Sequence, residues 1–197
     1  KSPAFRERVM NDPEFKQYVD EHGGWEGIVA ARLDSAALKK FEGMTIAEIA
    51  KIREQDPTSA CFDLIFEEGV FIHGVHHTMN EEDVKTVMRV PWVSIGSDGS
   101  ALNLKYPGKP HPRSFGTNPR VLGKYTRDEK VLTLEDAVRK MTSMPAQVLG
   151  LKDRGLLREG FCGDVVLFDP DSVADMATYE NPKQYPKGID YVLVNGT

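Results

Sequence analysis

The chain has 197 residues, 40% of them hydrophobic, and its 25 Lys and Arg against 30 Asp and Glu leave a net charge of −5. This length supports one ordinary core, or one domain with an appendage, and an acidic chain without a basic run argues against a nucleic-acid partner. No stretch approaches the roughly 18–20 apolar residues of a membrane span, and the first residues lack the apolar region of a signal peptide.

Both ends of the sequence have the character of cut ends. The chain begins at Lys1 without an initiator Met, and it stops at Thr197 in an expected strand and turn. We therefore expect a fragment or a processed chain. Cys61 and Cys162 form no CxxC pattern, and Cys61 lies in the apolar register of a helix. This cysteine usage favours a reducing, cytoplasmic setting.

The first part of the chain alternates helical patterns with short apolar runs. Helix-start residues and glycine stops predict helices over 2–21, 45–54 and 56–68. Apolar runs predict strands over 25–32 and 70–72, and the second run leads into three histidines, at positions 73, 76 and 77.

A second alternation ends on a carboxylate. Asn80 caps a predicted helix that Pro91 ends, and the apolar run 92–96 predicts a buried strand closed by Ser97-Asp98-Gly99. Helices and strands that alternate over short connections predict βα units and a parallel sheet.

The second half of the chain changes character twice. Residues 100–124 are rich in Pro, Gly and basic side chains and predict a long loop, which inside a compact domain is usually functional or disordered. Helices are predicted over 133–141 and 144–150. Strands over 165–168 and 191–194, with turns between them, predict part of a small β domain.

Asp98 is the first candidate for chemistry. A carboxylate at the C-terminal end of a strand in a (β/α)8 barrel points into the active site. There it can hold a metal-bound water and shuttle its proton to a leaving amine. The alternative is an ordinary Asp-Gly turn, a common dipeptide in turns.

Two further groups of residues invite a functional interpretation. Arg113, in the predicted loop, can grip a carboxylate through two parallel hydrogen bonds; the alternative is an exposed arginine without a role. His73, His76 and His77 match neither HxH nor HExxH spacing, so a place at a pocket rim or ordinary packing competes with metal ligation. The sequence contains no GxGxxG loop and no GxSxG elbow, which leaves nucleotide binding and serine hydrolysis without support.

Seven short strings between residues 92 and 196 carry a family likeness, and the resemblance as a whole covers the chain from about residue 43 to its end. Together they resemble the N-acyl-D-amino-acid deacylase (D-aminoacylase) family of the amidohydrolase superfamily, in the family's order. The strings are WVSIGSDG (92–99), HPR (111–113), GTNPRVLG (116–123), LEDAVRKMTSMPA (134–146), DRG (153–155), GDVVLFDP (163–170) and VNG (194–196).

The resemblance implies an α/β fold, the C-terminal portion of a metal-dependent amidohydrolase (β/α)8 barrel followed by strands of a small β-sandwich domain. Residues 1–155 are accordingly expected to belong to the barrel and residues 156–197 to the sandwich. The implied reaction is hydrolysis of the amide bond of N-acyl-D-amino acids by a zinc-activated water. The implied partners are this small-molecule substrate, and the missing N-terminal part of the barrel or a second copy, with no nucleic acid or membrane.

The resemblance also implies roles for single residues. Asp98 matches the catalytic Asp that takes a proton from the zinc-bound water and passes it to the leaving nitrogen. Arg113 matches the Arg that binds the substrate α-carboxylate. Met79 matches a residue of the side-chain pocket, and we expect one of His76 and His77, at the end of the preceding strand, to line that pocket as well.

The zinc ligands that the family implies have no counterpart in this sequence. They are an HxH pair, a Cys and further His residues on earlier barrel strands, so zinc is expected in the full-length enzyme with ligands upstream of this chain. The chain alone is expected to be inactive. The alternatives are a related cyclic-amide or dipeptide amidohydrolase, or a non-catalytic amidohydrolase-like scaffold; the presence of Asp98 and Arg113 argues against the scaffold.

Overall fold

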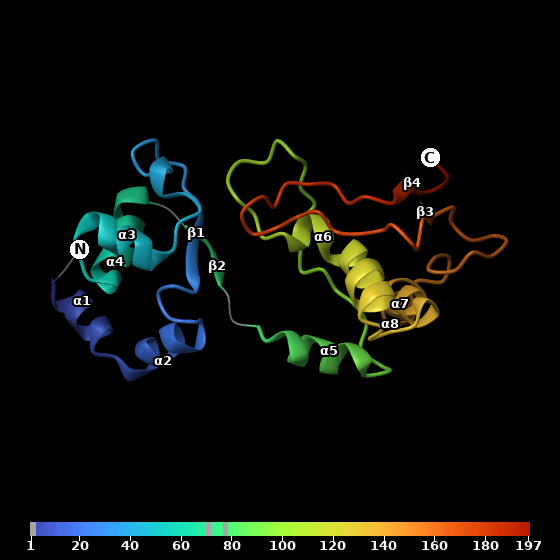
Figure 1. The fold of residues 1–197 in the computed structure, drawn as a ribbon, viewed down its shortest axis with the longest axis horizontal. Helices are drawn as coiled ribbons and strands as arrows, with labels where there is room; N and C mark the ends of the chain where they lie inside the picture. Colours follow the sequence, from blue (N-terminus) through green and yellow to red (C-terminus); the bar gives the residue numbers. More distant parts are fainter. Residues whose placement is uncertain (1–2, 70–71, 77–78) are drawn as a thin grey trace. The chain divides into compact units, whose positions relative to one another are not determined.

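The computed structural model describes residues 3–69, 72–76 and 79–197. Contacts divide the chain into two compact units (Figure 1): unit 1 comprises Lys1–Met79 with Lys105–His111, and unit 2 comprises Asn80–Leu104 with Pro112–Thr197. No helix within the described ranges is long and apolar enough to cross a membrane.

Unit 1 begins with two helices, α1 (Pro3–Met10) and α2 (Pro13–Glu21). The sequence predicts one continuous helix here, and that prediction is wrong at Asp12 and Pro13. Asp12 accepts a hydrogen bond from the Glu14 amide at 2.9 Å, and Pro13 has no N–H with which to continue the first helix. A new helix therefore begins at this pair.

The next two helices, α3 (Ile46–Arg53) and α4 (Pro57–Glu68), form where their caps predict them. Thr45 and Glu48 exchange the two hydrogen bonds of a capping box. Gly69 ends α4 in the left-handed region, at a φ of 73° that glycine adopts without steric cost.

The sheet of unit 1 has two antiparallel strands, β1 (Ile28–Arg32) and β2 (His73–His76), with Val29 opposite Val75. The predicted parallel sheet is therefore wrong for this pair. The helices α3 and α4 lie between these strands in the chain, and a connection of this length permits either direction of pairing. Residues 70 and 71 of the predicted strand 70–72 lie outside the described residues.

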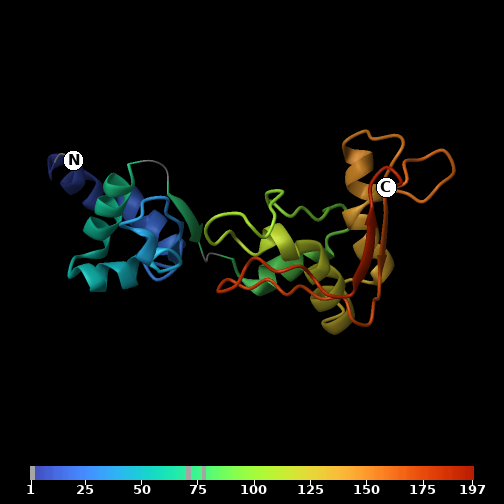
Figure 2. The same cartoon turned by 90° about the horizontal axis from the view of Figure 1, so that it is seen from above.

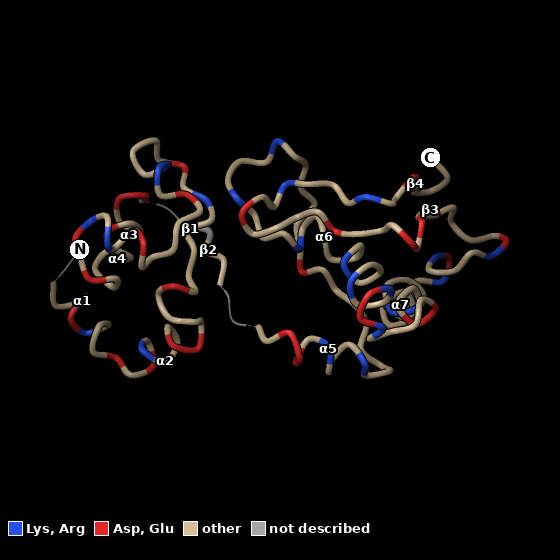
Figure 3. The backbone as a smooth tube through the Cα atoms, in the orientation of Figure 1, with Lys and Arg blue, Asp and Glu red and all other residues tan. Residues whose placement is uncertain are grey.

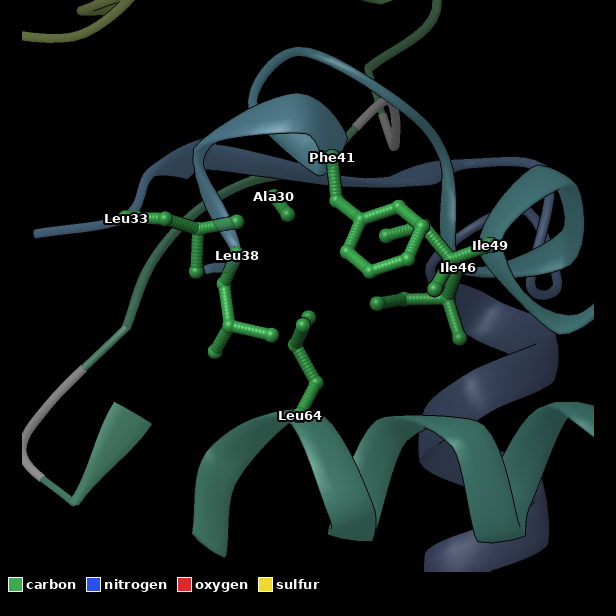
Figure 4. Close-up of a cluster of buried hydrophobic side chains, with 7 residues drawn as sticks. All are labelled: Ala30, Leu33, Leu38, Phe41, Ile46, Ile49 and Leu64. Carbon is green, nitrogen blue, oxygen red and sulfur yellow. The ribbon is translucent and has the colours of Figure 1, made fainter. Parts of the chain in front are cut away.

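A buried apolar cluster holds unit 1 together (Figure 4). It joins β1, the short 3-10 helix η1 (Lys39–Phe41), α3 and α4. Its members are Ala30, Leu33, Leu38, Phe41, Ile46, Ile49 and Leu64. Burying one large side chain contributes about 1.5–3 kcal/mol, while a two-stranded sheet is marginal in water, so this cluster rather than the sheet stabilises the unit.

Unit 2 begins with α5 (Glu81–Arg89), which Asn80 caps as predicted. Its first turn is acidic and its last turn carries Arg89 (Figure 3), an order that suits the helix dipole. The predicted buried strand over 92–96 is wrong for the described chain. These residues form no strand, and Trp92 is largely exposed. The described strands pair with one another, in two sheets of two strands each, so none of them supplies the ladder hydrogen bonds that a strand here would need.

The predicted loop over 100–124 is helical in its last part, so the prediction is wrong there. Helix α6 (Arg113–Arg120) passes directly into a π-helix, η2 (Val121–Asp128). The glycines of this stretch permit close packing rather than a loop. A Cβ at Gly123 would lie 2.5 Å from the Val173 carbonyl oxygen, so only glycine lets that segment approach η2.

Two predicted helices follow η2 and complete a second core. They are α7 (Leu134–Met141), capped by Thr133 as predicted, and α8 (Ser143–Val148). Side chains from α5, η2, α7 and the segment between the last two form the cluster, which comprises Met88, Val121, Tyr125, Leu132 and Ala137. This core fixes α7 against the end of α5.

The two strands predicted near the C-terminus form and pair antiparallel (Figure 2). They are β3 (Val165–Phe168) and β4 (Ile189–Leu193). The side chains of Leu167, Tyr191 and Val192 are each more than half exposed. The pair therefore presents apolar surface that the described residues do not cover.

Candidate active site

Asp98 lies in the segment of unit 2 that follows α5. Its backbone has a φ of 46°, in the left-handed region that few non-glycine residues adopt. The Gly99 amide donates to Ser97 Oγ at 3.2 Å, which closes the turn around Asp98. The carboxylate is 84% exposed, so Asp98 projects from an exposed turn rather than from the end of the buried strand that the sequence predicts.

The chain after Asp98 packs against the start of α6. The Ser100 amide donates to Ser114 Oγ at 3.3 Å, and a Cβ at Gly99 would lie 2.9 Å from the Ser114 Cα. Glycine is therefore required for this approach, and the approach brings the Asp98 turn beside the first residues of α6.

The first residue of α6 completes a pair with Asp98. Arg113 Nη2 lies 2.9 Å from Asp98 Oδ2, and both side chains are open to solvent. These are the two residues that the sequence assigns to proton transfer and to carboxylate binding. The structure brings them together within unit 2, although a predicted loop separates them in the sequence.

The remaining predicted site residues belong to unit 1. His76 ends β2 and lines an apolar hollow of about 380 Å³, together with Tyr18, Ile28, Cys61 and Leu64. The His22 ring packs edge-on against the His76 ring, with 5.0 Å between their centroids.

Two predicted pocket residues lie away from this hollow or beyond what the structure describes. Met79 is 78% exposed and does not line the hollow. His77 lies outside the described residues. Of the two described residues among these three, His76 lines the hollow and Met79 does not.

No three His, Cys, Asp or Glu side chains come together as a metal site within the described ranges. Burial raises the pKa of the Cys61 thiol to about 11. The pKa of the Cys162 thiol is raised mainly by the hydrogen bond that the thiol donates to Asp153. Both shifts favour the neutral thiol over the thiolate, the form that binds a metal.

The sequence does not single out the residues that hold the segment before Asp98. Lys140 and Arg139, at the end of α7, donate hydrogen bonds to the carbonyls of Val90, Pro91 and Val93. The one available signal is that Lys140 lies three residues after the buried Ala137, on the same face of an amphipathic helix. A lysine there is ordinarily read as a solvated side chain.

Comparison with known proteins places this geometry among amidohydrolases. A model of the amidohydrolase family matches residues 14–197. The chain is 42% identical over 154 residues to an N-acyl-D-glutamate deacylase, and 46% identical over 122 residues to a D-aminoacylase, both of Alcaligenes xylosoxydans xylosoxydans. These alignments cover 78% and 62% of this chain.

A solved structure has a similar fold. It is the N-acyl-D-glutamate deacylase of Bordetella bronchiseptica, complexed with zinc and a phosphonate inhibitor that mimics the tetrahedral intermediate. The TM-score is 0.78 at 37% sequence identity, over 90% of this chain and 35% of that one. The chain spans about a quarter to a third of the length of such relatives, since it covers 30% and 24% of the two Alcaligenes proteins.

Proposed function

The chain belongs to the amidohydrolase family, and we propose that it is the C-terminal part of a zinc-dependent enzyme that hydrolyses N-acyl-D-amino acids. One observation carries the proposal: Asp98 and Arg113 form a 2.9 Å pair in a chain with 42% identity to an N-acyl-D-glutamate deacylase. The pair joins a proton acceptor to a carboxylate-binding group, two functions that the proposed reaction uses besides the metal.

In the whole protein we place the described helices and the Asp98 segment at the end of a (β/α)8 barrel. Residues 156–197 then contribute strands to a β-sandwich. Two features support this architecture. The 92–96 segment is apolar but lacks neighbouring strands, and β3 and β4 expose Leu167, Tyr191 and Val192. Further strands would supply ladder hydrogen bonds to the 92–96 segment and would cover the exposed side chains of β3 and β4.

Asp98 is the proposed general base and acid. Its carboxylate is open to solvent, so a water and a leaving nitrogen can both reach it. It accepts a proton from the attacking water and returns it to the nitrogen as the amide bond breaks.

Arg113 is the proposed anchor of the substrate α-carboxylate. Its guanidinium presents donors in a planar fork that matches a carboxylate. An exposed ion pair contributes only about 0–1 kcal/mol, so a substrate carboxylate can share or replace the contact with Asp98 at small cost. This replacement leaves the Asp98 carboxylate available to the attacking water.

Zinc in the whole protein would lower the pKa of the attacking water and polarise the amide carbonyl. The described residues hold no cluster that could bind it by themselves, so the proposal takes the ligands from the part of the protein before this chain. This chain would contribute the proton transfer at Asp98 and the binding of the substrate carboxylate by Arg113.

Met79 and one of His76 and His77 are proposed to line the pocket for the D-amino-acid side chain. The apolar hollow beside His76 supports this role for one of them. Substitution of His76 by Ala should change the order in which the enzyme prefers D-amino-acid side chains. An unchanged order for His76→Ala and Met79→Ala would remove both residues from the pocket.

The test of the proposed function uses the full-length, zinc-loaded protein. We expect turnover of an N-acetyl-D-amino acid, none of its L enantiomer, and little of a cyclic amide such as a hydantoin. Asp98→Ala should lower kcat by roughly a hundredfold to ten-thousandfold, the usual contribution of general acid–base catalysis, with zinc content unchanged. Full activity of Asp98→Ala, or preferential turnover of the cyclic amide, would contradict the proposal.

A further inference from the structure

Lys140 is a fully buried lysine in α7, with no exposed surface. Lysine is almost never fully buried unless it is paired, because a desolvated ammonium group is costly without hydrogen bonds. The Lys140 ammonium donates to the Val90 carbonyl at 2.5 Å and to the Val93 carbonyl at 2.9 Å. The side chain is therefore committed to two backbone groups rather than to a carboxylate.

Both carbonyls belong to the turn that leads from α5 towards Asp98. Val90 is the C-cap of α5, and Val93 lies outside any helix or strand. The Val93 amide already bonds the Val90 carbonyl at 3.2 Å, so one ammonium joins both ends of this turn. An apolar side chain in place of Lys140 would leave the Val93 carbonyl without this partner.

The backbone of Lys140 and the side chain of its neighbour hold the same segment. The Ile95 amide donates to the Lys140 carbonyl at 3.0 Å. Arg139 Nη2 donates to the Pro91 carbonyl at 2.8 Å, and the same guanidinium is fixed by Asp136 at 2.8 Å. The last turn of α7 thus holds the chain at four successive points between residues 90 and 95.

These contacts define where the Asp98 turn leaves the core of unit 2. Ile95, the last held residue, precedes Asp98 by three positions, and Ser100 is tied to Ser114 on the other side. We propose that Lys140 is a positioning residue: by binding the 90–93 turn it sets the place of Asp98 relative to Arg113. The inference rests on the proposed function, because it takes the carboxylate of Asp98 to be the catalytic one.

Lys140→Met in the full-length, zinc-loaded protein tests the inference. Methionine keeps much of the length and apolar stem of lysine but cannot bond the two carbonyls. We expect kcat to fall by roughly a hundredfold, as for a catalytic group displaced by about 1 Å, while KM for an N-acetyl-D-amino acid changes less than twofold. Amide hydrogen exchange across residues 92–98 should speed up in the same variant.

Leu132→Ala is the matched control. Leu132 belongs to the same core, against which Ile95 also packs, but its apolar side chain cannot bond the backbone of the 90–95 turn, so this variant should lower the melting temperature and lower kcat far less than Lys140→Met does. Arg139→Gln is a milder second variant, since Arg139 is partly exposed and contacts the 90–95 segment through its bond to the Pro91 carbonyl; the variant also loses the ion pair with Asp136. It should show a smaller fall in kcat and faster exchange at the same residues.

Two results overturn the inference. One is unchanged exchange over residues 92–98 in folded Lys140→Met, and the other is an equal loss of kcat in Lys140→Met and Leu132→Ala. An inactive wild-type protein is a different outcome, because it refutes the proposed function. The exchange experiment then still decides whether Lys140 fixes the segment, since that measurement needs no turnover.

Discussion

Arg113 and Asp98 illustrate how much a single exposed ion pair can mean for binding while contributing little to folding. The pair is open to solvent, where such contacts contribute roughly 0–1 kcal/mol. The pair matters for the proposed reaction because it places the guanidinium fork within hydrogen-bond distance of the carboxylate. Substitutions at these positions should therefore change kinetics far more than stability.

Arg113→Lys should separate substrates by their carboxylate. Lysine keeps the positive charge but loses the planar fork, so KM for N-acyl-D-amino acids should rise on the order of tenfold, the effect of losing one hydrogen bond to a charged group. The corresponding amides, which lack the carboxylate, should be affected much less. Steady-state kinetics on each acid and its amide make the comparison, and equal effects on both would rule out the assignment.

Cys61 should be a poor nucleophile. Burial raises the pKa of its thiol to about 11, so at pH 8 its thiolate fraction is roughly two orders of magnitude below that of an exposed cysteine, since each pKa unit is a factor of ten. In Cys162→Ser protein, iodoacetamide should label Cys61 slowly at pH 8 and faster up to about pH 11. Peptide mass spectrometry gives the rate; labelling at pH 8 as fast as in urea would contradict the burial.

At the scale of elements, helix caps were predictable and long-range packing was not. Thr45, Asn80 and Thr133 cap the helices that the sequence predicts, because a cap is a contact over three residues or fewer. Helix α6 and the π-helix η2 were missed because their Gly and Pro residues resemble a loop. Glycine is needed at position 123 because the carbonyl of Val173, fifty residues later in the chain, lies against it. A local sequence pattern does not contain that contact.

A second long-range contact ties η2 to the start of α5. Glu81 Oε1 bonds Lys124 Nζ and also accepts from Tyr125 Oη at 2.7 Å. The bond from Lys124 is the main cause that lowers the pKa of Glu81 below its usual range. A carboxyl whose pKa is lower in the folded state adds stability above its unfolded pKa, and this stability is lost as pH falls through the folded pKa.

Glu81→Gln should therefore destabilise the protein at pH 7 and have little effect in acid. Glu81 is 45% exposed and solvent screens the pair, so the loss should be at most about 1 kcal/mol at pH 7. It should shrink as the pH falls below about 4.3, the ordinary pKa of Glu. Urea denaturation at pH 7 and pH 3.5 measures both values.

Glu82→Gln is the control for this element. It removes the same charge from the first turn of α5, but its partner Lys85 also pairs with Glu129. The pH dependence of its effect should be weaker than that of Glu81→Gln. Identical curves for the two variants would mean that the helix dipole, and not the contact with η2, accounts for the effect of Glu81.

At the scale of the whole molecule, two residues that the sequence singles out come into contact, although the strand expected before one of them does not form. Family strings indicate Asp98 and Arg113, and the structure places these two side chains in contact. The strand expected before Asp98 does not form in the described chain, because strand formation depends on neighbours as well as on the apolar run itself. Lys140 was missed because its two carbonyl partners lie about fifty residues earlier in the sequence.

The last prediction concerns the 197-residue chain by itself. A catalytic zinc site uses about three converging protein ligands, and no such cluster exists among the described residues. The purified chain should therefore hold no stoichiometric zinc and show no turnover of an N-acetyl-D-amino acid. Because β3 and β4 expose apolar side chains, it should also self-associate. Metal analysis, the deacylase assay and sedimentation velocity check the three outcomes; stoichiometric zinc with turnover would mean that this chain alone forms a complete site.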